Sequence, residues 1–143
     1  MIVVDASAIL ELLLRTSASD AVGRRLFRST ETLHAPRLID VEVMQVLRRY
    51  ARNRSVALPR LEEALEDFHA IQIERYSHEL LLPRIWELRD NLSAYDAAYI
   101  ALSELLRAPL VTFDTKLAGA PSHDVKIELL DRASAGSGDA IRR

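Results

Sequence analysis

The chain opens with a short apolar run that ends in an acid, Ile2-Val3-Val4-Asp5, and this run is the main indication of the fold class. A second run of the same kind, Leu110-Val111-Thr112-Phe113-Asp114, lies near the other end of the sequence. Continuous apolar runs of this length are typical of strands that are buried on both faces of a parallel sheet. Ligands of such sheets bind beyond the carboxyl ends of the strands, so Asp5 and Asp114 are the first candidates for chemistry.

Between these two runs, short β-rich stretches alternate with longer helical patterns. We expect strands at 2–5, 32–35, 70–74, 110–113 and 125–129. We expect helices that end near 14 and 27, and further helices at 38–52, from Pro59 onward, at 80–90 and at 94–106. Strands separated by a dozen or more helical residues cannot pair as hairpins. The sequence therefore predicts an α/β fold, a three-layer sandwich with a mainly parallel central sheet.

The composition is that of one ordinary globular domain, with 143 residues, a formal net charge of -2 and no cysteine. The lack of cysteine excludes disulfide frameworks, thiolate nucleophiles and thiolate-bound metals. No apolar stretch reaches the ~20 residues that a membrane helix needs, so we expect a cytoplasmic protein without membrane contact. We expect a single domain over 1–133 and a flexible C-terminal tail over 134–143, where small and polar residues offer little to pack.

Three acids could share one site, or each could have a local structural role. Asp5 and Asp114 both precede helix-like sequence and could simply cap those helices. Asp96 lies in a helix that is apolar around most of its circumference, where it could form a capping box with Ser93. If the two apolar strands are neighbours, however, Asp5 and Asp114 repel each other unless a proton or a cation lies between them. Taken together, the acids favour a shared site over separate caps.

The fourth acid is not fixed by the pattern, because the expected helix over 38–52 carries both Asp40 and Glu42. These two residues lie on opposite borders of the apolar stripe. Capping and the helix dipole already explain an acid near the helix start, as Asp40 is. Glu42 has no such local role. We therefore favour Glu42, and Asp40 stays open as the alternative.

Several segments of the chain resemble those of PIN-domain ribonucleases, and most closely the VapC toxins of bacterial VapBC toxin–antitoxin pairs. Besides the helix with Glu42, these segments are Ile2-Val3-Val4-Asp5-Ala6-Ser7, Ser93-Ala94-Tyr95-Asp96-Ala97-Ala98-Tyr99-Ile100-Ala101-Leu102 and Pro109-Leu110-Val111-Thr112-Phe113-Asp114-Thr115-Lys116-Leu117. The similarity spans nearly the whole chain up to about Leu130, with the order and spacing of the acids intact. One departure is Phe113, where many relatives have alanine, so we expect a bulkier pocket edge.

The residues and the resemblance point to the same chemistry. Clustered carboxylates supply the hard oxygen ligands that suit Mg²⁺ or Mn²⁺. We expect four acids to be catalytic and to hold one or two such ions: Asp5, Glu42, Asp96 and Asp114. Ser7 and Thr112 are candidates for hydroxyls that orient these carboxylates, although both could be ordinary strand-end residues. The resemblance implies a metal-dependent endoribonuclease that leaves 5′-phosphate and 3′-hydroxyl ends.

The resemblance also implies partners. It predicts a homodimer and a VapB-type antitoxin whose C-terminal segment lies in a groove beside the acids. The first helix contains the apolar run Leu12-Leu13-Leu14, which either faces such a partner or is sandwiched inside the monomer. We expect Leu13→Arg to distinguish these two cases.

Charge is unevenly distributed along the chain. Between Arg24 and Arg60 there are nine arginines against three acids. Guanidinium groups match phosphate oxygens, so the segment from Arg24 to Arg54 is our candidate track for an RNA backbone. The other interpretation is that these arginines are solvated helix faces.

The alternative function is a non-catalytic RNA-binding or protein-interaction module with a PIN-like fold. Other enzymes with aspartates at strand ends fit the sequence less well. A receiver domain has adjacent acids after its first strand, and a haloacid-dehalogenase-like phosphatase needs a second aspartate where Ser7 stands. The glycines form no phosphate-binding loop. A metal-dependent nuclease assay separates the enzyme from the binding module.

Overall fold

Five parallel strands form the central sheet in a computed structural model that describes residues 1–131. Across the sheet the strands follow the order β3-β2-β1-β4-β5, and each neighbouring pair is parallel. Their bounds are β1 Ile2–Val4, β2 Leu33–Pro36, β3 Ile73–Tyr76, β4 Leu110–Thr112 and β5 Ile127–Leu129. The predicted parallel sheet is confirmed. The predicted tail over 134–143 lies outside the described residues.

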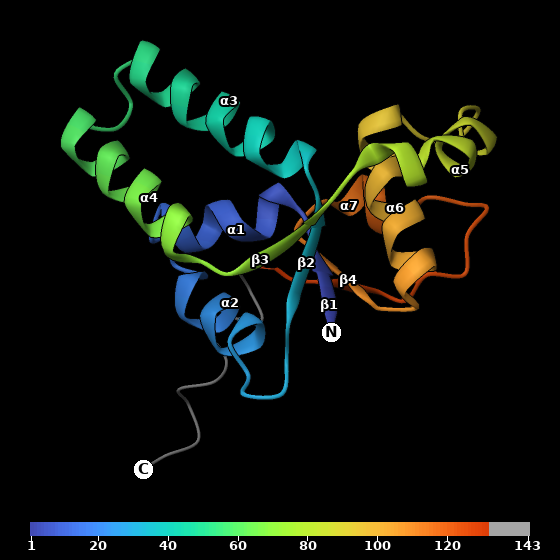
Figure 1. Cartoon of the computed structure of the whole chain (residues 1–143). Helices are drawn as coiled ribbons and strands as arrows, with labels where there is room; N and C mark the ends of the chain where they lie inside the picture. Colours follow the sequence, from blue (N-terminus) through green and yellow to red (C-terminus); the bar gives the residue numbers. More distant parts are fainter. Residues whose placement is uncertain (132–143) are drawn as a thin grey trace.

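Helices cover both faces of the sheet (Figure 1). Their bounds are α1 Ala6–Leu13, α2 Ser19–Leu26, α3 Leu38–Arg52, α4 Leu58–Ala70, α5 Leu82–Glu87, α6 Ala94–Leu106 and α7 Thr115–Ala118, with a 3₁₀ turn at His78–Leu80. On one side α1 packs against α2, α3 and α4, whereas on the other side α6 packs against α5 and against β1, β2 and β4. The three-layer α/β sandwich is therefore confirmed. Within residues 1–131, no helix has the length and apolar character needed to cross a membrane.

The strand order reverses at β1, and this places a ligand-binding edge between β1 and β4. From β1 the chain continues to β2 and β3 on one side, and later crosses to β4 and β5 on the other. The register pairs Val4 with Val111, and the Asp5 N–H donates to the Val111 carbonyl at 3.4 Å. The carboxyl ends of β1 and β4 therefore lie side by side. In open parallel sheets, ligands bind at such a reversal point.

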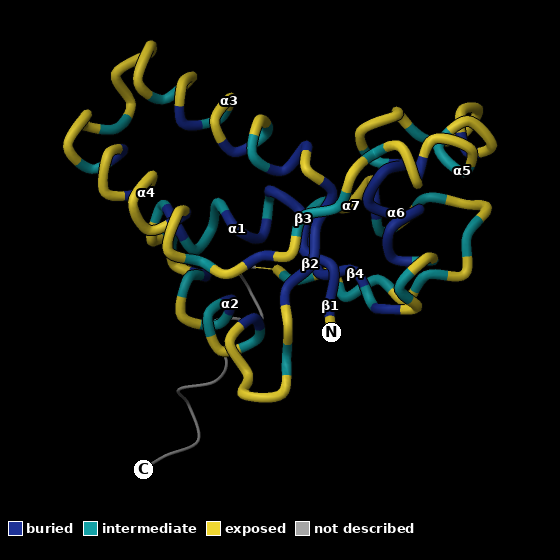
Figure 2. The backbone as a smooth tube through the Cα atoms, viewed as in Figure 1, coloured by how far each residue is buried: buried dark blue, intermediate teal, exposed yellow. Residues whose placement is uncertain are grey.

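The strands that support this edge are fully buried. Ile2, Val3 and Val4 are 0% exposed, and so are Leu110 and Val111. Figure 2 shows buried residues along the strands and exposed residues along the outer sides of α3 and α4. Burial of one such aliphatic side chain stabilises the fold by about 1.5–3 kcal/mol. The acids that follow β1 and β4 are thus attached to strands that are tightly packed in the core.

Some element boundaries differ from the prediction. The third strand begins at Ile73 rather than at 70, because α4 continues to Ala70 with Phe68 on its buried face. The last strand begins at Ile127 rather than at 125. The expected helix over 80–90 is divided into the 3₁₀ turn and the short α5. Proline lies in the first turn of α5, where its missing N–H is tolerated, so a new helix starts there.

Candidate active site

Asp5 is fixed by groups from the ends of two neighbouring strands. It follows β1 and caps α1, because the Ala8 N–H donates to its Oδ1 at 3.2 Å. The Ser7 hydroxyl donates to the same oxygen at 2.7 Å, and the Thr112 hydroxyl at the end of β4 donates to Oδ2 at 2.5 Å. The residue is only 6% exposed. Asp5 therefore caps α1 and also contacts the end of β4, so the two roles considered for it are compatible.

The backbone of Phe113 and Asp114 is tied to Asp5 through the same two hydroxyls. The Asp114 N–H donates to Thr112 Oγ1 at 2.9 Å, and the Phe113 N–H donates to Ser7 Oγ at 2.9 Å. Asp114 also caps α7, with Oδ1 accepting from the backbone N–H of the second helical residue at 2.8 Å. Burial raises the pKa of Asp5, and the negative charge of Asp114 contributes to the same shift. The two acids that follow the apolar strands are thus neighbours.

Asp96 lies in the first turn of α6. Ser93 caps this helix by accepting a hydrogen bond from the Asp96 N–H at 3.1 Å. The helix residues that follow, 97–103, are all buried, so the first turn is held firmly against the sheet. Burial raises the pKa of Asp96, the charge of Asp114 raises it further, and the nearby Lys116 partly opposes the shift. Asp96 therefore belongs to the same electrostatic neighbourhood as the strand-end acids.

Glu42 and Asp40 have different partners. Asp40 forms an ion pair with Arg75 of β3, with Nε and Oδ1 2.8 Å apart. The Glu42 Oε1 instead accepts a hydrogen bond from the Tyr99 hydroxyl of α6 at 2.6 Å. Burial raises the pKa of Glu42, and the charges of Asp5 and Asp96 raise it further. The structure thus brings Glu42, and not Asp40, toward the other acids.

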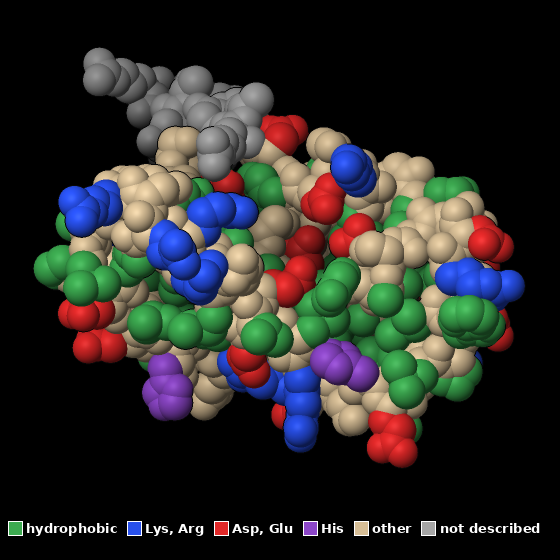
Figure 3. Space-filling model, turned by 90° about the horizontal axis from the view of Figure 1, so that it is seen from above, with side chains coloured by type: hydrophobic (Ala, Val, Ile, Leu, Met, Phe, Trp, Pro, Cys, Tyr) green, Lys and Arg blue, Asp and Glu red, His purple; other side chains and the backbone are tan. Residues whose placement is uncertain are grey.

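The four acids form an acidic region at the carboxyl ends of the strands. Figure 3 looks down on the carboxyl ends of the strands, and acidic side chains gather near the middle of this face. Among the described residues, none of the four takes part in an ion pair. Nor do any three acidic or histidine side chains of residues 1–131 form a ready cage for a metal ion. The region therefore contains carboxylate oxygens that could bind a cation and whose negative charges repel one another.

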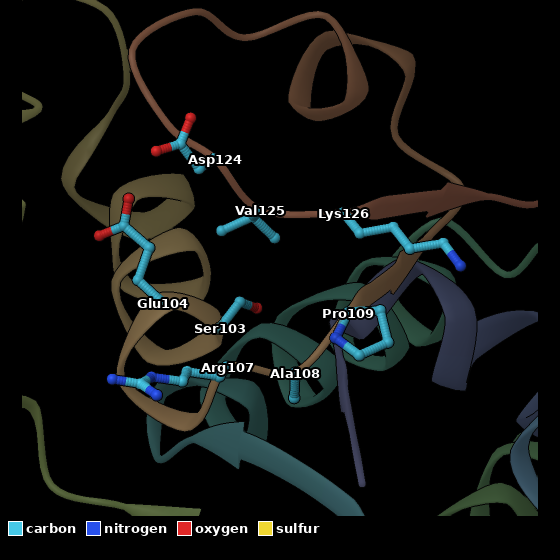
Figure 4. A pocket seen from close by; sticks show the side chains of 8 residues that line it. All are labelled: Ser103, Glu104, Arg107, Ala108, Pro109, Asp124, Val125 and Lys126. Atoms are coloured by element: carbon cyan, nitrogen blue, oxygen red, sulfur yellow. The ribbon is translucent and has the colours of Figure 1, made fainter.

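A second hollow, of about 510 Å³, opens at the opposite edge of the sheet, where β4 and β5 begin (Figure 4). Its charges are mixed, because Glu104 and Asp124 share the lining with Arg107 and Lys126. Glu104 is already engaged in an ion pair with Arg84, with Nε and Oε2 2.7 Å apart. This hollow lacks the repelling carboxylates of the first region. The acidic cluster is therefore the better candidate for chemistry.

Known proteins share both the sequence and the fold of this chain. A family model for the PIN domain matches residues 2–121. The chain is 41% identical over 132 residues to VapC ribonuclease Mb0985 of Mycobacterium bovis, and the match covers 92% of this chain and 100% of that protein. It is 38% identical over 130 residues to ribonuclease VapC12 of Mycobacterium tuberculosis, covering 91% and 99%. The chain belongs to the VapC family of PIN-domain proteins.

A solved structure agrees with this assignment at the level of the fold. The VapC-family chain matches a chain of the toxin–antitoxin complex from Klebsiella pneumoniae with a TM-score of 0.57 and 20% identity. The match covers 85% of this chain and 93% of that one. The resemblance that the sequence motifs predict is confirmed by the family model and by the two relatives.

An apolar groove of about 700 Å³ lies beside the acids of this VapC-family chain, between α1 and α3. Its lining includes Leu10, Val41 and Tyr95 together with Glu42. Leu13 is not part of this groove, because it is 1% exposed and packs in the core. Of the two cases left open for this helix, Leu13 fits the one in which it is sandwiched inside the monomer. One face of α1 is buried in the monomer, and Ala6, Ser7 and Leu10 of this helix line the groove.

Tyr99 is the residue of the cluster that sequence reasoning missed. It is 2% exposed, and its hydroxyl donates to Glu42. The sequence contains one indication of this role: Tyr99 lies in an apolar helix, and a buried tyrosine needs a hydrogen-bond partner for its hydroxyl. Tyr99 also follows Asp96 by three residues, which places both on neighbouring positions of the same helix surface.

Proposed function

We propose that this VapC-family chain is a divalent-metal-dependent endoribonuclease and acts as the toxin of a toxin–antitoxin pair. The observation that carries the proposal is the set of four acids at the reversal point of the sheet, all without an ion pair among the residues described. The relatives named as VapC ribonucleases match over nearly their full length, which supports RNA as the substrate. An RNA substrate places the activity in the cytoplasm.

The donor set fits Mg²⁺ or Mn²⁺. Both ions prefer oxygen ligands, and Mg²⁺ usually keeps several waters while binding through only one or two carboxylates. A loose cluster without a closed cage of three ligands suits such a hydrated ion. We assign the ligand role to Asp5, Asp96 and Asp114, assisted by Glu42. When bound, the ion supplies activation of water and neutralisation of charge at the scissile phosphate.

The chain's own residues prepare the cluster for this reaction. Ser7 and Thr112 hold both oxygens of Asp5, and the Thr112 hydroxyl also accepts from the Asp114 backbone. Tyr99 holds Glu42 from the opposite helix. Fixed carboxylates need no reorganisation when the phosphate arrives. In the reaction that we propose, water adds to phosphorus and the 3′ oxygen leaves, which yields 5′-phosphate and 3′-hydroxyl ends.

The test compares purified parental protein with Asp5→Asn, which keeps the side-chain shape but removes one negative charge. RNA cleavage in Mg²⁺ should fall at least ~100-fold, the scale on which loss of one charge-stabilising group acts. EDTA should abolish cleavage by the parental protein, and added Mg²⁺ or Mn²⁺ should restore it. Asp40→Asn, outside the cluster, is the matched control and should cleave normally. Equal cleavage by Asp5→Asn and the parental protein would end the proposal and leave an RNA-binding or protein-interaction module as the alternative.

We further propose that a VapB-type antitoxin binds the apolar groove and that the chain forms a homodimer. The groove adjoins Glu42 and exposes Val41 and Tyr95, each 67% exposed. The fold match to a chain of a toxin–antitoxin complex supports such a partner. Leu10→Arg should weaken antitoxin binding while the protein stays folded. Sedimentation of the chain with and without antitoxin measures both assemblies.

A further inference from the structure

Beyond Glu42, the exposed face of α3 carries a group of arginines. Arg48, Arg49 and Arg52 are exposed and line a shallow hollow of about 430 Å³ together with Gln45 and Asn53. In Figure 1, α3 extends from the carboxyl edge of the sheet away from the strands, and Figure 2 shows its outer side exposed. We call the surface formed by Arg48, Arg49 and Arg52 the α3 ridge.

Several arginines elsewhere in the molecule are paired with acids. Arg25 binds Glu128 with 2.6 Å between Nε and Oε2. Arg84 binds Glu104 at 2.7 Å, as described above. In the part of the chain that the structure describes, no arginine of the α3 ridge forms an ion pair. The ridge therefore presents three positive charges without an ion pair within about one helical turn.

The ridge is continuous with the acidic cluster. Gln45 lines both the arginine hollow and the groove that contains Glu42. Ten residues separate Glu42 from Arg52, which is about 15 Å along a helix with a rise of about 1.5 Å per residue. The residues at 45, 48, 49 and 52 follow the spacing of one helix face. A strand whose scissile phosphate lies at the acids can thus extend along α3 over this distance.

We propose that the α3 ridge binds the phosphates of the single-stranded RNA that flank the cleavage position, an inference that rests on the proposed nuclease function. Guanidinium groups bind phosphate oxygens through two parallel hydrogen bonds, which makes phosphate the matching chemistry. Such contacts supply affinity and orientation without reading bases. In the candidate track over Arg24–Arg54, Arg25 is already held between Glu128 and Glu31, and the proposal assigns the phosphate contacts to the α3 ridge.

The test measures how salt affects RNA binding. A fluorescently labelled single-stranded RNA is titrated with the full chain in EDTA, so that no cleavage occurs, at several salt concentrations. Each phosphate contact contributes about 0.7 to the slope of log affinity against log salt for single strands. The triple variant R48Q/R49Q/R52Q should therefore lower the slope by about 2 and weaken binding roughly fifty-fold at 0.15 M salt. Glutamine keeps high helix propensity, and circular dichroism verifies the fold.

The matched control is R24Q/R28Q/R107Q, which changes the net charge equally on other exposed surfaces. It should keep the parental slope. Equal losses in both triple variants would overturn the inference, because net charge alone would then explain binding. An unchanged slope in the ridge variant, or a loss of antitoxin binding with RNA binding intact, would also overturn it.

Cleavage kinetics separate failure of the ridge from failure of the nuclease proposal. In Mg²⁺, the ridge variant should show a raised KM with kcat within about threefold of the parental value, as expected for loss of uniform binding. If the parental protein cleaves RNA and the ridge variant has the same KM, the ridge inference alone is wrong. If the parental protein does not cleave RNA with any added metal, the proposed function fails. The salt dependence of RNA binding in EDTA still tests whether the α3 ridge binds phosphates.

Discussion

Replacing Tyr99 by phenylalanine removes a single hydroxyl from the cluster and leaves the ring in the core. That hydroxyl lies 2.6 Å from the Glu42 carboxylate. A hydrogen bond to a charged group contributes about 1.5–3 kcal/mol. Residues that orient metal-binding carboxylates typically affect metal affinity or activity by about 10–100-fold. We therefore expect Tyr99→Phe to lower RNA cleavage by about 10–100-fold, with part of the loss recovered at high Mg²⁺.

The assay measures initial cleavage rates over a range of Mg²⁺ concentrations, together with thermal unfolding of each variant. Tyr76→Phe is the matched control, because it removes a partly buried hydroxyl that is hydrogen-bonded to His34 Nδ1 at 2.8 Å, outside the acidic cluster. Tyr76→Phe should reduce stability without changing the dependence on Mg²⁺. If Tyr99→Phe cleaves RNA at the parental rate with the same dependence on Mg²⁺, Tyr99 does not position Glu42 for the reaction.

Three further predictions concern stability and the choice of residues. The raised pKa of Asp5 means that the folded state holds its proton more tightly than the unfolded chain, so ionisation costs stability. This cost is absent below the ordinary value of 3.8 and complete above the folded pKa, so metal-free Asp5→Asn should gain stability relative to the parental protein as pH rises. Denaturant unfolding across pH checks this, and a difference that stays flat or falls would contradict it. Leu13→Arg should prevent folding, because Leu13 is 1% exposed, whereas Leu10→Arg should fold; circular dichroism distinguishes them, and a folded Leu13→Arg protein would refute the packing. Asp40→Asn breaks the ion pair with Arg75 and should cost at most about 1 kcal/mol, because the pair is partly exposed. A loss of cleavage in Asp40→Asn would reverse the choice of Glu42 over Asp40.

Elements with strong local signals could be predicted from the sequence. The helices α3 and α6 have the predicted bounds, because apolar periodicity marks α3 and a serine cap marks the start of α6. The strand β1 is an apolar run that no helix periodicity matches. The sequence predicts the start of β3 too early because residues 70–74 alternate like a strand, whereas Phe68 and the preceding turn hold Ala70 in the helix. Tertiary packing, which the local sequence does not display, decided that boundary.

The choice between Glu42 and Asp40 shows where sequence reasoning ends. Both acids lie at the border of the same apolar stripe, so helix periodicity treats them alike. What separates them is the position of Arg75 and Tyr99, which are 35 and 57 residues away along the chain. These contacts exist only once β3 and α6 are in place. The strand-end acids were easier to find, because the rule for parallel sheets brings their ends together without knowledge of side chains.

The most direct test of the central claim, that the four acids share a divalent cation, is calorimetric titration of metal-free protein with Mn²⁺. The parental chain should bind Mn²⁺ saturably, and Asp114→Asn should weaken that binding at least ~10-fold, whereas Asp40→Asn should leave it unchanged. The absence of Mn²⁺ binding to the parental chain, or equal affinity in Asp114→Asn, would contradict the claim.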